Sequence, residues 1–319
     1  MKQQSPEATG LEKYRKQTRK EQFLGEMEEI IPWKELCEVI EPYYPKPQGA
    51  GRKPIGLERM LRIHFLQHWF ELSDPGAEEA LYDSRAMRLF VGIDLGREPV
   101  PDETTICNFR HLMERNNLGD ELFRLVNVYL AENGMKLNRG TIVDATIINA
   151  PSSTKNKEKK RDPDMHQTRK GNQWYFGMKA HVGTDTRRGL VHRVMVTDAS
   201  VHDSRIMDDL LHGEETVVYG DKAYADEVKR NEYRKRGIEW CVNRKGKRGH
   251  LLSEGDREWN HTHNRIRAKG EHAFHVVKCL WNYRKVRYKG LAKNAAQVFS
   301  LFALANLYLV RKELVMMRA

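Results

Sequence analysis

The stretch Gly140-Thr-Ile-Val-Asp-Ala-Thr-Ile-Ile-Asn-Ala150 decides the fold. Its apolar residues occupy both parities, so that Ile142 and Val143 would face opposite sides, which is typical of a strand covered on both faces. Asp144 lies in its middle, although strands disfavour Asp and rarely bury it without a partner. Asp144 is therefore either a satisfied structural aspartate or a metal-binding carboxylate on a central strand. The second interpretation requires further carboxylates downstream.

The balance of charge indicates the class of partner. The chain of 319 residues holds 55 Lys and Arg against 44 Asp and Glu, a net charge of +11. Residues 222–290 alone hold 19 against 8. An excess of this sign, concentrated in one segment, predicts a polyanionic partner, either nucleic acid or an anionic membrane surface.

Other features of composition indicate the compartment. The most apolar run, 298–310, is shorter than a membrane span and is expected to form a helix buried against a sheet. The first residues lack the apolar segment of a secretory signal. The four cysteines are scattered and form no CxxC pair, so they predict neither a disulfide framework nor a zinc site. We expect a protein of the reducing, cytoplasmic compartment.

The first 135 residues are predicted to be helical. An N-terminal helical arm would occupy 1–45, followed by a Pro- and Gly-rich linker and a helical domain over 46–135. Helices are expected at 57–72, 78–90, 103–115 and 118–133, and Asp102 would cap the third. This pattern fits a helix-turn-helix-like DNA-binding domain, and it fits any small helical bundle equally well.

The residues that follow the Asp144 strand are basic. Residues 151–172 have no apolar periodicity, and their cations are Lys155, Lys157, Lys159, Lys160, Arg161, Arg169 and Lys170. Such a run is usually a solvated loop. Its place directly after Asp144 also fits contact with phosphates. Beyond it, segments 174–184 and 189–197 alternate and predict an antiparallel hairpin.

Two further carboxylates follow. Asp221 ends a short apolar strand and precedes a helix, where α/β sheets present functional side chains, and Lys222 beside it is a candidate phosphate contact. Residues 264–278 are predicted as one helix with an apolar stripe. At 100° per residue, Arg267, Glu271 and Lys278 would lie within about 40° of one another along one border of that stripe.

Two interpretations of this helix stay open. Gly270, which is unfavourable in a helix, would let its backbone approach the sheet closely. Glu271 could then serve as a third metal ligand, while Arg267 and Lys278 contact phosphates. It could instead form an ordinary i,i+4 salt bridge with Arg267.

The residue types indicate a chemistry. Carboxylate oxygens suit Mg²⁺ or Mn²⁺. Two such ions, roughly 4 Å apart, can activate an attacking hydroxyl and neutralise the leaving oxygen in a phosphoryl displacement. Asp144, Asp221 and Glu271 are the candidate holders of that pair.

Long stretches of this sequence carry a family resemblance. They are Met60-Leu-Arg-Ile-His-Phe-Leu-Gln-His-Trp69, Thr105-Ile-Cys-Asn-Phe-Arg-His111, Val143-Asp-Ala-Thr-Ile-Ile-Asn-Ala-Pro-Ser-Ser-Thr-Lys-Asn-Lys-Glu158, Gly171-Asn-Gln-Trp-Tyr-Phe-Gly-Met-Lys-Ala-His181 and Tyr288-Lys-Gly-Leu291. Over residues 19–309 the chain resembles a DDE-class bacterial transposase of the insertion-sequence-five family. The family's final-helix signature, Tyr-x2-Arg-x3-Glu-x6-Lys, fits Arg267, Glu271 and Lys278, with Asn264 at the tyrosine position.

The resemblance implies a fold and an activity. The fold would be an RNase H-like mixed sheet flanked by helices, over residues 136–319, behind an all-helical DNA-binding region. Asp144, Asp221 and Glu271 would be the catalytic and metal-binding triad. The enzyme would bind the inverted-repeat ends of its own element, hydrolyse a phosphodiester and join the freed 3′-hydroxyl to target DNA. By the same resemblance, such enzymes usually act as homodimers on double-stranded DNA. Acting on DNA would place this one in the cytoplasm, at the bacterial nucleoid.

Several alternatives remain. A catalytically silent DNA-binding regulator of the same descent would share these features, and so would an RNase H-like nuclease without strand transfer. His202 could shuttle protons as an auxiliary residue, or it could cap a helix. A zinc site at the histidines of 261–275 lacks a cysteine pair to complete it. Trp174, Tyr175 and Phe176 are predicted to fill the core rather than to stack on a base.

Overall fold

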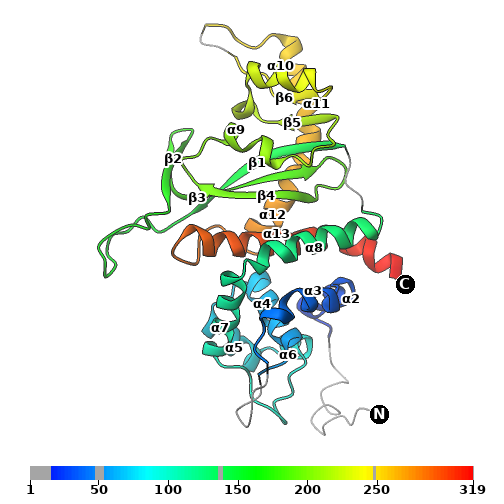
Figure 1. The fold of residues 1–319 in the computed structure, drawn as a ribbon, viewed down its shortest axis with the longest axis vertical. Helices are drawn as coiled ribbons and strands as arrows, with labels where there is room; N and C mark the ends of the chain where they lie inside the picture. Colours follow the sequence, from blue (N-terminus) through cyan, green and yellow to red (C-terminus); the bar gives the residue numbers. More distant parts are fainter. Residues whose placement is uncertain (1–15, 47–53, 136–138, 247–248, 319) are drawn as a thin grey trace.

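The computed structural model describes residues 16–46, 54–135, 139–246 and 249–318 (Figure 1). The start of the predicted arm and most of the linker lie outside these ranges. The first half contains α2 (Arg19–Ile30), α3 (Trp33–Ile40), η2 (Glu41–Tyr43), α4 (Leu57–Phe70), α5 (Asp74–Asp83), α6 (Arg85–Val91), α7 (Glu103–Arg115) and α8 (Leu118–Glu132). The second half contains β1 (Gly140–Asn149), β2 (His166–Lys170), β3 (Gln173–Asp185), β4 (Val191–Asp198), α9 (Asp203–Ile206), η3 (Asp208–Leu210), β5 (Val217–Gly220), η4 (Lys222–Tyr224), α10 (Glu227–Lys235), β6 (Glu239–Val242), α11 (Glu254–Arg267), η5 (Ala268–Gly270), α12 (Glu271–His275), the π-helical turn η6 (Val276–Leu280) and α13 (Leu291–Arg318).

The six strands form one mixed sheet with β1 inside it. On one side β1 pairs antiparallel with β3, which also pairs antiparallel with β2 and β4. On the other side β1 pairs parallel with β5, and β6 continues the parallel part beyond β5. The predicted hairpin of β3 and β4 and the predicted strand before Asp221 are confirmed.

Helices cover both faces of this sheet. Val143 packs with the helices that follow β4 and β5, in a cluster that includes Leu210 and Tyr224. Ile148 belongs to the larger core on the opposite face, which α12 and α13 cover. Ile142 and Val143 are both fully buried. The prediction of a strand covered on both sides is therefore confirmed.

The helical region matches most of its predicted elements. The helices expected at 57–72, 103–115 and 118–133 are α4, α7 and α8, and Asp102 caps α7 by accepting from Thr105 N at 2.7 Å. The single helix expected at 78–90 is wrong. Ser84 has extended backbone between α5 and α6, and its hydroxyl accepts from the amide of Met87 to begin a new helix. Among the described helices, none combines the length and apolarity needed to cross a membrane.

The long helix α13 joins the helical region to the sheet, and Figure 1 shows it running between them. Asn306, in its centre, is fully buried. Its Oδ1 accepts from Val191 N at 2.8 Å, and its Nδ2 donates to Val191 O and to Asn127 Oδ1. On the helical side α8 crosses α13 so closely that a Cβ atom at Gly119 would lie 2.3 Å from Ala296 O. The predicted burial of 298–310 against a sheet is confirmed.

A second connection runs through residues 282–287. Asn149, the last residue of β1, donates its amide to Arg284 O at 3.1 Å and accepts from Val286 N at 2.8 Å. In the same segment, Arg287 Nη2 lies 3.3 Å from the carboxylate of Glu71, the residue directly after α4. The end of the Asp144 strand is therefore bonded to a segment that also holds the helical region.

Residues 166–176 differ from expectation. The predicted loop 151–172 contains the strand β2, which its polar sequence His-Gln-Thr-Arg-Lys did not indicate. The prediction that Trp174 fills the core is wrong, because 64% of its surface is exposed. Tyr175 is half-buried, and Phe176 packs partly against the core.

Candidate active site

Asp144 and Asp221 come from neighbouring parallel strands. Gly140 of β1 pairs with Val217 of β5, and Ile142 pairs with Tyr219. The same register, continued by two residues, places Asp144 beside Asp221, where adjacent strands lie about 4.8 Å apart. Both residues are half-buried. Asp221 also begins η4 by accepting from Ala223 N at 2.7 Å.

The segment from α11 to η6 crosses the face of β1 that carries Asp144. Gly270 lies against Ile142, with only 3.0 Å between the position of a Cβ atom and Ile142 Cγ2. Further along the same face, Lys278 Nζ donates to Thr146 Oγ1 at 3.0 Å and to Ile147 O at 2.9 Å. Asp144 lies between these two contacts, so Glu271, next to Gly270, begins the part of the helix that passes it. The expected close approach at Gly270 is confirmed.

The segment is not the single regular helix that was predicted. It changes from α-helix to a 3-10 turn at Ala268–Gly270 and to a π-helical turn at Val276–Leu280. The angular separation of Arg267, Glu271 and Lys278 at 100° per residue is therefore only approximate. Within the described residues, Glu271 makes no ion pair with Arg267, so the alternative of an i,i+4 salt bridge is not realised.

The electrostatics of Asp144 reflect its position among other carboxylates. Burial is the main cause that raises the pKa of Asp144 from 3.8 to about 6. The charges of Asp221 and Glu271 raise it further, whereas the amide of Ala145 and the charge of Arg267 lower it. Three acidic side chains therefore share one electrostatic environment in which the ionised form of Asp144 is disfavoured.

This raised pKa predicts a dependence of stability on pH. Between pH 4 and 6 the native state holds a proton that the unfolded chain has released, so the free energy of unfolding falls as pH rises through that window. Replacing Asp144 with Asn should remove this contribution and leave the variant more stable than the wild type above pH 6, by on the order of 2 kcal/mol. Urea titrations of both proteins in EDTA at pH 4.5 and 7 would measure it. Parallel losses of stability in the two proteins would contradict the assignment.

The donor set suits a hard cation, although no closed metal cage is formed. Among the described residues, no group of three or more His, Cys, Asp or Glu side chains is arranged to hold a metal ion. Glu271 is exposed, unlike the two half-buried aspartates. A divalent cation between the carboxylates would offset both the burial of Asp144 and the smaller repulsion from Asp221 and Glu271, which together raise its pKa, so the residues present fit such an ion.

Arg267 is positioned by two asparagines. Asn264 Oδ1 accepts from Arg267 Nη1 at 3.0 Å and from Asn243 Nδ2 at 2.8 Å. Asn243 follows β6, and its amide donates to Gly220 O, beside Asp221. Asn264 therefore orients the arginine, whose charge acts on Asp144. No sequence pattern indicates Asn243, because its link to Asn264 depends on the pairing of β5 with β6.

Tyr224 is a buried residue of this site that the sequence analysis missed. It is 1% exposed, and its hydroxyl has no hydrogen-bond partner among the described residues. Burial raises its pKa well above the usual range, and the charges of Asp203, Asp144 and Asp221 act in the same direction. Its place three residues after Asp221 was the only available signal.

His202 acts as a helix cap. Its Nδ1 accepts from Ser204 N at 3.3 Å at the start of α9, which is the structural alternative considered for it. The next residue, Asp203, accepts from Lys179 Nζ at 2.9 Å. The influence of Asp203 on Tyr224 places this cap near the carboxylates.

The other predicted phosphate contacts lie in two places. Lys222 is exposed directly after Asp221. The remaining cations are exposed on the loop and hairpin between β1 and β3: Lys155, Lys157, Lys159, Lys160, Arg161, Arg169 and Lys170. Lys278, in contrast, is half-buried and bonded to β1, and burial lowers its pKa.

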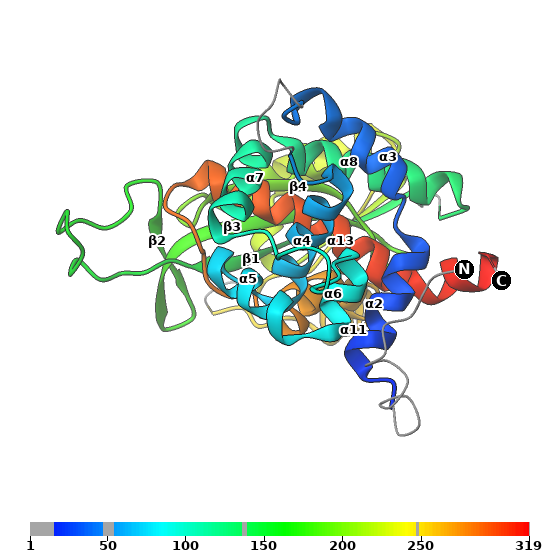
Figure 2. The same cartoon turned by 90° about the horizontal axis from the view of Figure 1, so that it is seen from below.

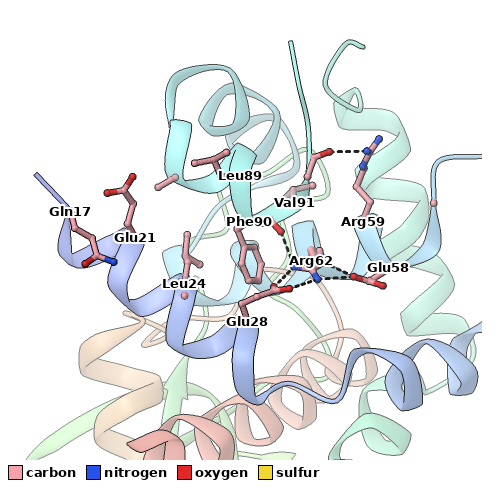
Figure 3. A pocket seen from close by; sticks show the side chains of 14 residues that line it. Gln17, Glu21, Leu24, Glu28, Glu58, Arg59, Arg62, Leu89, Phe90 and Val91 are labelled. Atoms are coloured by element: carbon pink, nitrogen blue, oxygen red, sulfur yellow. Dashed lines mark hydrogen bonds and ion pairs between the residues drawn. The ribbon is translucent and has the colours of Figure 1, made fainter. Parts of the chain in front are cut away.

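A large pocket lies elsewhere, in the helical region. It measures about 780 Å³ between α2, α4 and α6, and Leu24, Leu89 and Phe90 form part of its wall (Figure 3). Arg62 pairs there with Glu28 and Glu58, which joins α2 to α4. Asp144, Asp221 and Glu271 are not among the residues that line this pocket.

Comparison with known proteins supports one family. Residues 136–307 match the transposase DDE domain, and residues 12–112 match a transposase domain (DUF772). Among solved structures, the piggyBac transposase synaptic complex with hairpin DNA is similar at 9% identity and a TM-score of 0.45, over 93% of this chain and 73% of that one. The Mos1 strand transfer complex is similar at 15% identity and a TM-score of 0.21, over 77% and 83%.

The two structural likenesses are too distant to bear on the chemistry. The domain match is different, because it covers more than half of the chain and contains β1, β5 and the α11–η6 segment. It therefore includes all three carboxylates. The chain belongs to the transposase DDE domain family, and it is a transposase.

Proposed function

We propose that this transposase belongs to the insertion-sequence-five family and that Asp144, Asp221 and Glu271 are its catalytic residues. The observation that supports the proposal is the register of β1 and β5, which, extended by two residues beyond the pair Ile142–Tyr219, aligns the two aspartates, with Glu271 on the helix that crosses the face of Asp144. The order of the sheet, antiparallel on one side of β1 and parallel on the other, supports an RNase H-like fold.

The three carboxylates would hold Mg²⁺ or Mn²⁺. Bound there, a pair of divalent ions would supply Lewis-acid stabilisation of the attacking and leaving oxygens in phosphoryl transfer. The covering helix lies on the face of β1 that carries Asp144, while Tyr224 packs with Val143 on the opposite face. Arg267, fixed by Asn264, presents a guanidinium to a phosphate that approaches the aspartates. Lys278 is proposed to position the helix on β1 and to reach phosphates only secondarily.

The substrate is proposed to be double-stranded DNA: the inverted-repeat ends of the element and a target. The enzyme would hydrolyse a phosphodiester at an end and join the 3′-hydroxyl to the target, as a homodimer in the bacterial nucleoid. The charge of the second half of the chain supports a DNA substrate, since residues 136–319 hold 37 Lys and Arg against 21 Asp and Glu. Residues 1–135 hold 18 against 23, so a DNA-binding domain at 46–135 would have to rely on local contacts.

One gel tests this function. A labelled duplex that carries the DNA flanking the coding region is incubated with the protein, with and without Mg²⁺, and then with an unlabelled target. We expect Mg²⁺-dependent cleavage that leaves a 3′-hydroxyl, followed by a joined product. Cleavage without joining would identify a nuclease, and binding without cleavage would identify a regulator; either result would overturn the proposal.

The cationic loop gives a prediction of its own. Replacing Lys157, Lys159 and Lys160 with Ala should weaken DNA binding and lower the slope of log K against log salt by about 2–3, because each lost phosphate contact removes about 0.9. Fluorescence anisotropy over a range of salt concentrations would measure this slope. Replacing the exposed Lys34 and Lys312, on α3 and α13, is the control and should leave it unchanged. A slope equal to the wild type's in the triple variant would show that the loop is only solvated.

A further inference from the structure

The hairpin of β2 and the first residues of β3 projects from the body of the molecule. Figures 1 and 2 both show the segments between β1 and β3 reaching beyond the sheet and the helices. In β2 only Thr168 is not fully exposed, and β3 becomes buried only from Gly177 onward. A two-stranded ribbon of this kind has little core of its own.

An aromatic residue lies near the tip of this ribbon. Trp174 exposes 64% of its surface, and its partner across the ribbon is Arg169. Lys170 and Gln173 form the last pair before the turn. A large aromatic ring held in water beside guanidinium and ammonium groups is suited to a partner that offers both flat apolar surface and negative charge.

The acidic and basic residues of the adjoining loop differ in their partners. Its three acidic residues each have a partner in residues 289–291: Glu158 pairs with Lys289 at 2.5 Å, Asp162 accepts from Gly290 N at 2.7 Å, and Asp164 accepts from Leu291 N at 3.0 Å. Its cations are exposed, and Arg161 also lies over the ring of Phe176. No described carboxylate forms an ion pair with Lys155, Lys157, Lys159, Lys160, Arg161, Arg169 or Lys170. The acidic residues anchor the loop, and over 151–176 seven cations outnumber these three acids.

The position of Trp174 relative to the carboxylates follows from the strand register. Asp144 pairs with Val182 on β3, and Trp174 lies eight residues further along the same strand, at the same parity. At about 3.4 Å per residue the separation is about 27 Å. This equals roughly 8 base pairs of duplex at about 3.4 Å each. Trp174 and Asp144 thus share one face of the sheet, with Lys278 and Phe176 on the same face.

We propose that residues 166–176, with the loop 151–165, form a DNA-binding arm whose Trp174 inserts into a groove of the duplex about 8 base pairs from the phosphodiester at Asp144. The inference rests on the proposed DNA substrate and adds a contact and its location. Arg169, Lys170 and the loop lysines neutralise the flanking phosphates, while the indole packs on sugars and base edges. A second protein chain is a poorer fit for this surface, because seven cations outnumber three acidic residues over 151–176.

The test compares duplex lengths, and it needs no cleavage. Binding of random-sequence duplexes of about 6 and about 20 base pairs is measured by anisotropy in EDTA, since only the longer one can reach both Asp144 and Trp174. We expect Trp174→Ala to lose about tenfold in affinity for the long duplex and almost nothing for the short one. Trp174→Phe should retain most of the affinity. Met316→Ala, which removes another exposed apolar side chain, on α13, should match the wild type.

Three results would overturn the arm. They are equal affinity of Trp174→Ala and the wild type for the long duplex, equal losses for both lengths, and loss of self-association of the DNA-free variant in sedimentation velocity. The last would identify a protein contact instead. Because binding is read without Mg²⁺, failure of the arm is distinguishable from failure of catalysis, which the cleavage gel reports separately.

Discussion

Replacing Asp144 with Asn is expected to reduce Mg²⁺-dependent cleavage of end DNA on the order of 10³-fold or more, while DNA binding is retained. Asparagine keeps the size of the side chain and can still accept from Ala145 N, which Asp144 Oδ1 does at 2.8 Å. It removes the negative charge that a divalent cation requires. Loss of several kcal/mol of Lewis-acid stabilisation corresponds to a rate effect of this size.

The matched control is Asp209→Asn, which neutralises an exposed carboxylate on η3 in the same half of the chain. It should cleave like the wild type. Gel shifts of all three proteins on the same duplex would show that binding is preserved. Residual Mg²⁺-dependent nicking by Asp144→Asn at more than a few per cent of the wild-type rate would reject Asp144 as a metal-holding residue.

Replacing Gly119 with Ala is expected to destabilise the protein by about 1–3 kcal/mol, which reverses the usual sign of this substitution in a helix. The new Cβ atom would lie 2.3 Å from Ala296 O and 3.1 Å from Ser300 Oγ. The first contact is with the backbone of α13, so rotation of a side chain cannot relieve it. The two helices would have to separate, and the core between them would loosen.

Gly25→Ala is the control for Gly119→Ala. Gly25 lies inside α2, and nothing lies within 4 Å of its Cβ position. This variant should be more stable by about 0.5–1 kcal/mol, because Ala is the better helix former. Urea denaturation midpoints of both variants would measure the opposite signs. A Gly119→Ala protein as stable as the wild type would show that α8 and α13 can separate at little cost.

Much of the fold could be predicted because it depends on local patterns. The strand around Asp144, the capped helix after Asp102 and the apolar helix at 298–310 each follow from periodicity and end signals within one segment. The helix break at Ser84 could not be predicted in this way, because the apolar periodicity of 78–90 continues through Ser84 and fits a single helix as well as two. Strand β2 has no apolar alternation that would indicate a strand. It is extended because it pairs with β3.

The carboxylates of the candidate site could be predicted from the sequence, but the residues that pack around them could not. Three carboxylates on separate elements could be found in the sequence, and their mutual effect on the pKa of Asp144 supports their proximity. The roles of Asn243 and Tyr224 depend on which strands pair and which helix covers them. The exposure of Trp174 was mispredicted for a related reason: an aromatic residue on an alternating strand is usually buried, and only the projection of the ribbon leaves this one in water.

The bonds of residues 282–287 have a mechanical consequence. Because this segment is hydrogen-bonded to the last residue of β1 and ion-paired to the end of α4, the helical region is not a module that swivels on a tether. A partner bound to the helical region would therefore be held in a set orientation relative to Asp144. A rotation of that region would pull on the strand carrying the aspartate, so engagement of a partner at one end could be transmitted as strain to the other.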